Sequence, residues 1–539
     1  MNQLQIFICH QFEGCHDIFI DAFRALQHKT SDIRNAFILT HYHADHYGGL
    51  PRGNAYVGPA KIHCTPVTAN LLREIHNIGS EFIIPHEYGT TWKHTNSEVT
   101  FYDANHCPGA AIVFVKLINK LADSSCTCTS TYHLHTGDMR FHEKFKSYPL
   151  LQQAVANRQL DNLYLDTTYA KPKHTFIPQE EAIHMIASQV KDLLNFNDGI
   201  VDQKKKSFFQ PKVNKSETEK KSSERTLVLL SCYSIGKEKV LWQSAVESNQ
   251  LIYCNKTKQR MLRCIKCHKH VDAASGIIDK CTDDKQKSDI HIITMGTAGS
   301  MHPYFQANFD ECALYAHRMN KGYSKVVAFI PTGWADSSKY NKENAVSTKT
   351  VDLKELLKGS KINGNEHMIK VEVRLVAYSE HSSYNELRDC VEFMKPKRII
   401  PTVFSGEKDY IAIEKRFRDL VDSHRAKQAF INTIGGSKVR EETLFTAGMK
   451  RKAEIKTHHV KNNFGKKTAV SMKARGTFCT INKATDGKAG KKEDRKATKA
   501  DDMKVAQLVS MGFSAKNASE SLIAKNNDLE KAIEWLLIR

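Results

Sequence analysis

The sequence has few of the features that mark membrane proteins or disulfide-rich secreted proteins. No stretch of about 18 consecutive apolar residues occurs, so we expect no membrane span. The opening segment, residues 1–6, does not combine a charged stretch with an apolar one, so we expect no signal peptide. The 14 cysteines are irregularly spaced along 539 residues, which favours free thiols in a reducing compartment over a disulfide framework.

Acidic residues are fewer than basic ones, but the imbalance is local. The chain carries 79 lysines and arginines against 59 aspartates and glutamates, which gives a formal net charge of +20. About 16 basic and 4 acidic residues fall within 450–500, and about 8 and 3 within 203–225, so these two segments carry most of the excess. Basic segments of this kind can contact DNA, RNA or import receptors. They do not by themselves predict a basic groove in the folded parts.

A dense polar cluster follows the apolar run 36–40. His41, His43, Asp45 and His46 lie within six positions. A continuous apolar run predicts a buried strand, so the cluster lies where a strand gives way to a loop. In an extended chain residues i and i+2 point the same way, which places His41 beside His43. Imidazole and carboxylate groups suit zinc or a similar metal, and their density favours a metal site over a histidine-rich surface loop.

Other predicted strands also end on a histidine or an aspartate followed by turn-forming residues. These strand ends carry Asp21, His106, Asp138, Asp166 and His381. Functional side chains gathered on loops at strand ends are the usual way in which an α/β sheet builds a site. The length of the chain also predicts two or more domains.

Three helices are indicated by capping residues and apolar spacing. Thr65 and Pro66 predict the start of a helix that runs to about Gly79. Apolar residues at helical spacing predict an amphipathic helix over about 178–196. Ser382 and Ser383 are suitable caps for a third helix, which places His381 beside a helix N-terminus that could hold a phosphate.

Two further motifs leave alternatives open. A strand, then Gly236 and Lys237, then a helix start can hold an anion, although the glycine spacing of a phosphate-binding P-loop is absent. Cys264 and Cys267, with Cys281 nearby, resemble half of a zinc knuckle. The alternative for the cysteine pair is a polar turn in a variable region, and for Lys237 it is a solvated lysine.

Seven segments together resemble the DNA cross-link repair nucleases of the metallo-β-lactamase/β-CASP superfamily. They are HYHADHYGGL (41–50), DANHCPGA (103–110), HTGDMRF (135–141), YLDTTY (164–169), YSIGKEKV (233–240), YSEHSSYNEL (378–387) and IIPTV (399–403). They occur in the family's order and are most similar to its cross-link repair exonuclease branch. The tail, with Met511-Gly512-Phe513 and Leu536-Leu537, is similar to a ubiquitin-associated domain.

The resemblance implies an α/β fold, a metallo-β-lactamase αββα sandwich with an inserted β-CASP α/β domain and a C-terminal three-helix module. The expected divisions are the first part of the sandwich (1–170), the β-CASP domain (171–370) with a disordered insert (200–225), the return to the sandwich (371–447), a basic linker (448–500) and the ubiquitin-associated domain (501–539). The lysine-rich, polar and unpatterned composition of 448–500 independently predicts disorder.

The resemblance also implies a role for each site residue. The metal ligands it implies are His41, His43 and His106 for one ion, Asp138 as a bridge, and Asp45 with His46 for a second ion. Asp21 would orient the histidine loop, and Asp166 and His381 would be β-CASP motifs. Val403 stands where RNA-cutting relatives supply a histidine. A valine at this position is the type associated with DNA-acting members. We therefore expect one tight zinc site and a weaker second site for Zn, Mn or Mg.

The activity implied is that of a metal-dependent 5′-to-3′ DNA exonuclease in interstrand cross-link repair and the DNA damage response. Lys237 and Ser382 are the candidates for gripping the 5′-phosphate of single-stranded or gapped DNA. The expected ubiquitin-binding residues of the tail are Met511, Gly512, Phe513, Leu536 and Leu537. The lysine-rich tail and the function lead us to expect a nuclear location. The alternatives are an RNA-processing β-CASP nuclease and a catalytically inactive ubiquitin-dependent scaffold.

Overall fold

The chain divides into two compact units, Met1–Ala426 and Lys427–Arg539. The computed structural model describes residues 10–24, 31–53, 56, 60–119, 129–195, 225–266, 273–300, 305–333, 346–357, 368–422, 504–505, 508, 515–527, 532 and 536. Within these ranges no helix is both long enough and apolar enough to span a membrane.

Two sheets of the first unit pack face to face. One has the parallel order β1 (Ile18–Ile20), β2 (Ala36–Ile38), β3 (Lys61–Cys64), β4 (Ile83–Pro85). The other has the order β19 (Arg398–Pro401), β9 (Leu160–Leu165), β8 (Thr129–His135), β7 (Ala111–Asn119), β6 (Ser97–Asp103), β5 (Thr91–His94). Ile18 and Ile20 pack with Val99 and Val113 between the sheets, whereas Phe19 faces the opposite core. This alternation buries β1 on both faces, as the central layers of an αββα sandwich require.

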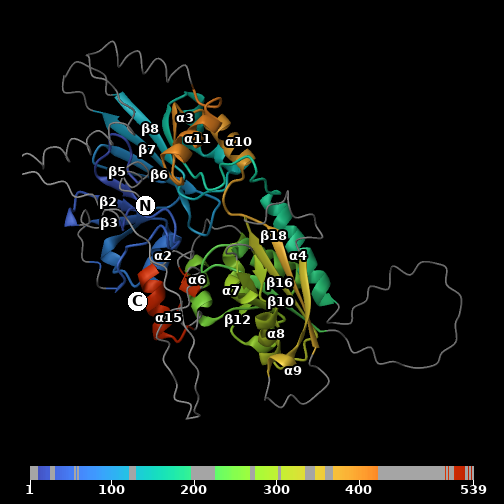
Figure 1. Cartoon of the computed structure of the whole chain (residues 1–539). Helices are drawn as coiled ribbons and strands as arrows, with labels where there is room; N and C mark the ends of the chain where they lie inside the picture. The colour runs from blue at the N-terminus through green and yellow to red at the C-terminus, as the bar shows by residue number, and fades with distance from the viewer. Residues whose placement is uncertain are drawn as a thin grey trace, which may run out of the picture. The chain divides into compact units, whose positions relative to one another are not determined.

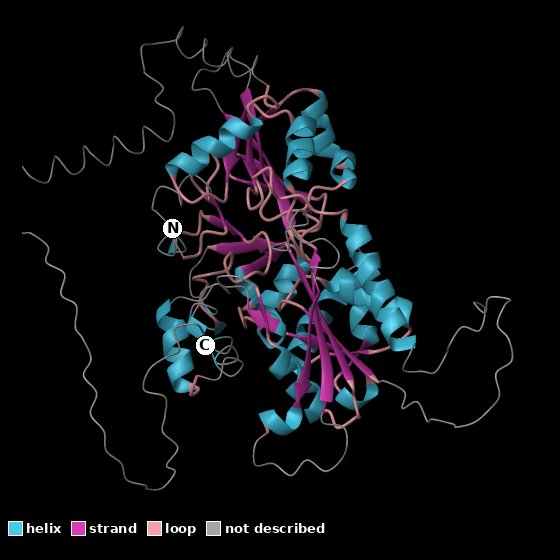
Figure 2. Cartoon of the chain, turned by 45° about the vertical axis from the view of Figure 1, so that its right-hand side comes forward, coloured by secondary structure: helices cyan, strands magenta, loops and turns pink. Residues whose placement is uncertain are grey.

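A third sheet forms the inserted lobe. Its order is β12 (Cys281–Thr282), β11 (Ile252–Tyr253), β13 (Ile290–Ile293), β10 (Thr226–Ser231), β16 (Lys325–Thr332), β18 (Met368–Ala377), β17 (Val346–Asp352). Figure 1 shows β10, β16 and β18 side by side, and these strands pair in parallel, so their carboxyl ends share one edge. Figure 2 shows helices on both sides of this sheet. A separate short antiparallel pair is formed by β14 (Gly299–Ser300) and β15 (Gln306–Ala307).

The strand β18 corrects one predicted boundary. The predicted inserted domain ends at residue 370. However, β18 pairs with β16 as far as Ala377 and with β17 as far as Arg374, so the chain leaves this sheet only after Ala377. After that point β19 pairs with β9 of the sandwich. The predicted α/β fold, a sandwich with an inserted α/β domain, is confirmed.

Helices cover these sheets. The α-helices are α2 (Pro66–Glu74), α3 (Pro149–Ala156), α4 (Gln179–Asn195), α5 (Glu238–Ser248), α6 (Lys256–Lys266), α7 (Met295–Ala298), α8 (Phe309–Arg318), α9 (Leu353–Leu356), α10 (Tyr384–Met394) and α11 (Glu407–Phe417). Short 3₁₀ helices are η3 (Ser80–Phe82), η4 (Glu143–Ser147), η6 (Ala273–Lys280) and η7 (Lys285–Lys287). Thr65 caps α2 as predicted, but the helix ends before Gly79 because Asn77 adopts a left-handed conformation (φ 59°). Ser383 caps α10 in a capping box with Glu386.

The second unit is described only in part. Its helix α15 (Ala515–Ala524) belongs to a small apolar cluster formed by Val505, Leu508, Ala518, Leu522, Ala532 and Leu536. Met511, Gly512, Phe513 and Leu537 of the predicted ubiquitin-binding surface lie outside the described residues, as do residues 200–224 of the predicted insert (200–225) and the predicted linker at 448–500.

Candidate metal centre

The polar strand ends of the first unit meet at one place. Asp21 follows β1, His41 follows β2, His106 follows β6, Asp138 follows β8 and Asp166 follows β9. The inserted lobe adds His381, which follows β18. Three sets of side chains lie close enough to share an ion, namely His41, His43, His106 and Asp138; Asp45, His46 and Asp138; and Asp138, Asp166 and His381.

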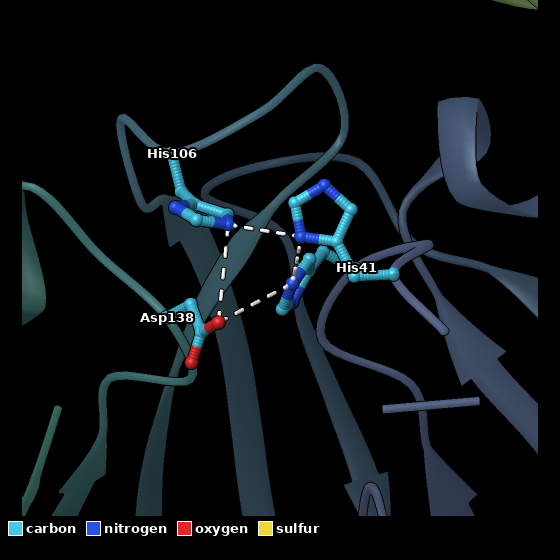
Figure 3. Close-up of side chains that lie close together, drawn as sticks. His41, His106 and Asp138 are labelled. Atoms are coloured by element: carbon cyan, nitrogen blue, oxygen red, sulfur yellow. Dashed lines mark hydrogen bonds and ion pairs between the residues drawn. The ribbon is translucent and has the colours of Figure 1, made fainter. Parts of the chain in front are cut away.

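The first set has the spacing of ligands around one small cation. His43 Nδ1 lies 2.9 Å from His41 Nε2 and 3.1 Å from His106 Nε2. Asp138 Oδ2 lies 3.7 Å from His41 Nε2 and 3.9 Å from His106 Nε2. Figure 3 shows His41, His106 and Asp138 pointing toward one another. Ligands about 2.05 Å from a tetrahedral Zn²⁺ lie about 3.3 Å apart, a value that these distances bracket.

The inserted lobe fixes the ring nitrogens of two of these histidines. His43 Nε2 donates to the carbonyl oxygen of Ile235 at 3.0 Å, and His106 Nδ1 donates to that of Glu380 at 2.8 Å. Burial lowers the pKa of His43 and holds that of His106 well below its usual range, so both rings are neutral. Their inward nitrogens therefore carry lone pairs and face each other at 3.1 Å.

His41 is held in the Nδ1–H tautomer, like His106, by a relay to Asp21. The Thr40 hydroxyl donates to Asp21 Oδ2 at 2.7 Å, so it accepts from His41 Nδ1 at 3.0 Å. Burial holds the pKa of His41 well below its usual range, and its Nε2 also presents a lone pair. Three converging lone pairs beside a carboxylate repel one another unless a cation lies between them, so these residues fit a metal ion.

The second set depends on the same aspartate. His46 Nδ1 donates to Asp21 Oδ2 at 2.8 Å, and His46 Nε2 lies 3.1 Å from Asp138 Oδ2 and 3.8 Å from Asp45 Oδ2. Burial lowers the pKa of His46, but the three aspartates outweigh burial and hold it well above its usual range. Asp21 thus contacts the histidine loop at two points, which supports its predicted orienting role. The side chain of Asp45 is 69% exposed, so this set is less enclosed than the first.

Asp166 and His381 form a pair at the edge of the cluster. Asp166 is buried, and its Oδ2 accepts from His381 Nδ1 at 2.8 Å and from the backbone N–H of Met139 at 3.1 Å. His381 Nε2 lies 4.0 Å from Asp138 Oδ2. Burial lowers the pKa of His381, but Asp166 and Asp138 outweigh burial and raise it to about 9. The pair therefore presents an N–H donor toward the cluster.

The two residues predicted to grip a phosphate are buried and hydrogen-bonded within the protein. Lys237 is only 4% exposed, and its Nζ donates to the carbonyl oxygen of Pro331 at 2.6 Å. Ser382 Oγ accepts from the Phe141 N–H at 2.9 Å and donates to the Met139 carbonyl oxygen at 3.2 Å. The predicted roles stay predictions, and these contacts do not favour them because each hydroxyl or ammonium group already has a partner within the protein.

Other predicted positions fall beside the centre or away from it. Val403 is exposed, and its carbonyl oxygen accepts from Thr167 Oγ1 at 2.6 Å, so its side chain supplies no ligand. Cys264 is buried in α6, where its Sγ donates to the Arg260 carbonyl oxygen at 3.3 Å. Cys267 lies outside the described residues, and no cysteine belongs to a potential metal-binding set within them.

Sequence reasoning missed the backbone groups of Ile235 and Glu380 and the side chain of Arg140. The carbonyls carry no signal in the sequence, because every residue has one. Arg140 stands in the segment HTGDMRF, where its position two residues after Asp138 was the available signal.

Comparisons with known proteins point in one direction. Residues 275–407 match the family described as DNA repair metallo-beta-lactamase, and residues 501–538 match the UBA-like domain. DNA ligase 6 of Arabidopsis thaliana is 33% identical over 420 residues, which cover 77% of this chain and 25% of that protein. The DNA cross-link repair protein SNM1 of the same organism is 31% identical over 373 residues, 69% of this chain and 61% of that protein.

A more distant relative is the 5′ exonuclease Apollo of Gallus gallus. It is 23% identical over 386 residues, which cover 70% of this chain and 60% of that protein. The chain thus spans less than two thirds of the length of each of these relatives.

Proposed function

We propose that the chain is a metal-dependent nuclease acting on DNA, on the premise that residues 275–407 match the DNA repair metallo-beta-lactamase family and residues 501–538 match the UBA-like domain. The matches confirm the resemblance to the cross-link repair nucleases that the seven sequence segments predicted. The observation that carries the proposal is the convergence of three neutral imidazole nitrogens and the Asp138 carboxylate on one point. That arrangement is the donor set of a hydrolytic metal centre.

Each set of ligands would have its own part in holding metal. His41, His43, His106 and Asp138 would hold a Zn²⁺ ion tightly. Asp138 would share a second ion, Zn, Mn or Mg, with Asp45 and His46, and the exposure of Asp45 supports weaker binding there. The bound metal would supply Lewis-acid stabilisation of charge on a phosphodiester and lower the pKa of a water molecule.

Asp166 and His381 would act on the leaving group. The hydrogen bond from Nδ1 to Asp166 fixes the orientation of the His381 ring, so that Nε2 faces the ligand cluster. From there Nε2–H would donate to the oxygen that leaves, or to charge that develops on the phosphate. Asp21 would act through the histidine loop and would not touch the substrate.

We also propose that cleavage starts at a 5′-phosphorylated end of single-stranded or gapped DNA and proceeds 5′ to 3′. The support is the resemblance to the exonuclease branch and the similarity to a relative named as a 5′ exonuclease. Because Lys237 and Ser382 are bonded within the protein, we do not assign the terminal phosphate to them.

The tail and the family matches suggest where the enzyme works. We propose that the module at 501–538 binds ubiquitin or a ubiquitylated protein, through a surface that includes Met511, Gly512, Phe513, Leu536 and Leu537. We propose a nuclear role in interstrand cross-link repair, in line with the relative named as a DNA cross-link repair protein.

The deciding experiment is a cleavage assay on the purified full chain. A 5′-phosphorylated single-stranded DNA should be shortened from its 5′ end, and a chelator should stop the reaction. Asp138→Asn should abolish cleavage because it removes a charged oxygen shared by all three ligand sets. Asp310→Asn, at an exposed aspartate on α8, is the matched control and should cleave like the wild type.

Two outcomes would count against the proposal. Full activity of Asp138→Asn, with an unchanged circular dichroism spectrum, would remove the metal mechanism. Faster cleavage of a matched RNA than of the DNA would assign the enzyme to RNA processing instead.

A further inference from the structure

Tyr233 is an exposed aromatic side chain on the loop that follows β10. It is 47% exposed, and it is the one aromatic residue among the exposed large apolar side chains of the described ranges. Aromatic rings are mostly buried in folded proteins, because burial removes a large apolar area from water. An exposed ring close to a reaction centre is therefore a candidate contact for a ligand.

The loop that carries Tyr233 reaches the metal centre. Two residues further on, the carbonyl oxygen of Ile235 accepts the hydrogen bond from His43 Nε2 at 3.0 Å. The same loop continues to Lys237, whose backbone N–H donates to the Glu380 side chain, one residue before His381. Tyr233 thus lies on the rim formed by the inserted lobe, a few residues from groups that hold the metal ligands.

The ring of Tyr233 is held in place from behind. Lys237 Nζ lies 4.0 Å from the ring centroid, and the Pro331 carbonyl oxygen fixes that ammonium at 2.6 Å. The backbone carbonyl oxygen of Tyr233 accepts from Lys258 Nζ at 3.2 Å. The lysine covers one face and the residue remains half exposed, which leaves part of its surface accessible to a ligand. Because the ring is already held in place, little ordering entropy is lost when a ligand binds.

We propose that Tyr233 stacks on the nucleobase of the nucleotide held at the metal centre. This inference rests on the proposed nuclease function and adds a positioning residue to it. A nuclease that removes successive nucleotides has to hold each base without reading its identity. Stacking on an aromatic face does this, because every base has a π-face, whereas hydrogen bonds to base edges would select among sequences.

The test compares oligonucleotides that differ only at the terminal base. One 5′-phosphorylated strand ends in 2-aminopurine and the other in an abasic tetrahydrofuran residue. Binding is measured by fluorescence in the presence of Ca²⁺ or chelator, conditions chosen to prevent cleavage, and KM and kcat are measured separately in active buffer. The variants are Tyr233→Ala, Tyr233→Phe as the conservative replacement, and Val246→Ala as a control at an exposed position on α5.

Tyr233→Ala should bind the 2-aminopurine strand roughly 5- to 150-fold more weakly than the wild type, mostly through KM. It should also lose the quenching of 2-aminopurine fluorescence that stacking produces. Tyr233→Phe should restore both signals, and the abasic strand should bind the wild type and Tyr233→Ala equally. Equal weakening of both strands by Tyr233→Ala, or no weakening of either, overturns the inference. A wild type that binds but does not cleave would refute the nuclease proposal and leave the stacking result readable.

Discussion

Arg140 connects the two loops that carry Asp138 and His381. Its side chain is only 1% exposed, and its guanidinium donates to the Ser379 carbonyl oxygen at 2.7 Å and to Glu386 Oε1 at 3.0 and 3.1 Å. It also donates to the carbonyl oxygen of Ile177 at 3.0 Å. Ser379 and Glu386 follow β18, and Ile177 precedes α4. The Arg140 side chain therefore fixes the ends of the inserted lobe against the sandwich loop that carries Asp138.

Replacing Arg140 by methionine keeps most of the volume and removes every donor. Glu386 then remains partly buried without its cation, and two carbonyl oxygens lose a charged partner. Removing one member of a buried ion pair costs about 3–5 kcal/mol of unfolding free energy. The carbonyls add to this cost in principle, but neighbouring effects do not sum, so we expect a total loss of about 3–5 kcal/mol. Nuclease activity should fall as well, because the spacing between Asp138 and His381 is no longer fixed.

The assay is urea unfolding of the full chain followed by circular dichroism, in parallel with cleavage at a temperature where the variant stays folded. Arg140→Lys should recover only part of the stability, since one ammonium cannot reach all of the partners that the planar guanidinium serves. The double variant Arg140→Met/Glu386→Gln should be more stable than Arg140→Met, because the unpaired charge is gone. A loss below about 1 kcal/mol for Arg140→Met, or full stability of Arg140→Lys, would refute the reasoning.

Three further predictions concern other parts of the chain. Burial raises the pKa of Asp289, but hydrogen bonds from Lys321 and Tyr323 outweigh burial and lower it. The stability that this carboxylate contributes is therefore present above about pH 5 and is lost as the pH falls through the folded pKa. The unfolding free energies of the wild type and of Asp289→Asn should converge at low pH, and a difference that stays constant with pH would contradict this. Ser383→Ala removes the capping box of α10 and should cost about 0.5–2 kcal/mol in urea unfolding, whereas Ser383→Asp should keep most of the cap. Leu522→Ala empties a buried position of the second unit and should cost that unit about 2–5 kcal/mol of unfolding free energy. The proposed ubiquitin binding, measured by calorimetry, should be lost while the proposed DNA cleavage stays unchanged, and a parallel loss of cleavage would show that the units are not independent.

The parts of the fold that the sequence predicts are those set by local chemistry. Thr65 and Pro66 start α2 because a hydroxyl cap and a proline suit the first turn, and the apolar spacing predicted α4 almost to the residue. The end of α2 was placed too late, because the left-handed conformation of Asn77 competes with an apolar pattern that continues. The membership of β18 in the inserted sheet could not be predicted, since its pairing with β16 joins residues 45 positions apart, as Lys325 and Lys370 are, and depends on topology.

The candidate site divides in the same way. The candidate ligand side chains can be identified from the sequence, because imidazoles and carboxylates crowded at strand ends are typical of metal sites. The phosphate-gripping role predicted for Lys237 shows the limit of that logic. A lysine at a helix start after a glycine is a reasonable anion seat in sequence, but the strand end of β16 supplies a carbonyl oxygen that takes its ammonium first. Competition from a distant backbone group cannot be seen in a local motif.

The inserted lobe shapes the first set of candidate metal ligands, although none of those side chains comes from it. The carbonyl oxygens of Ile235 and Glu380 select the tautomers of His43 and His106, and so turn two lone pairs toward the Asp138 carboxylate. Without those acceptors either ring could place a proton on its inward nitrogen, and the cluster would be satisfied by internal hydrogen bonds instead of a cation. The loops that supply the carbonyls also carry Tyr233 and His381, the two residues to which we assign substrate contact. Metal affinity and substrate contact therefore depend on the same docked position of the lobe, so a change that loosens this lobe should weaken both together.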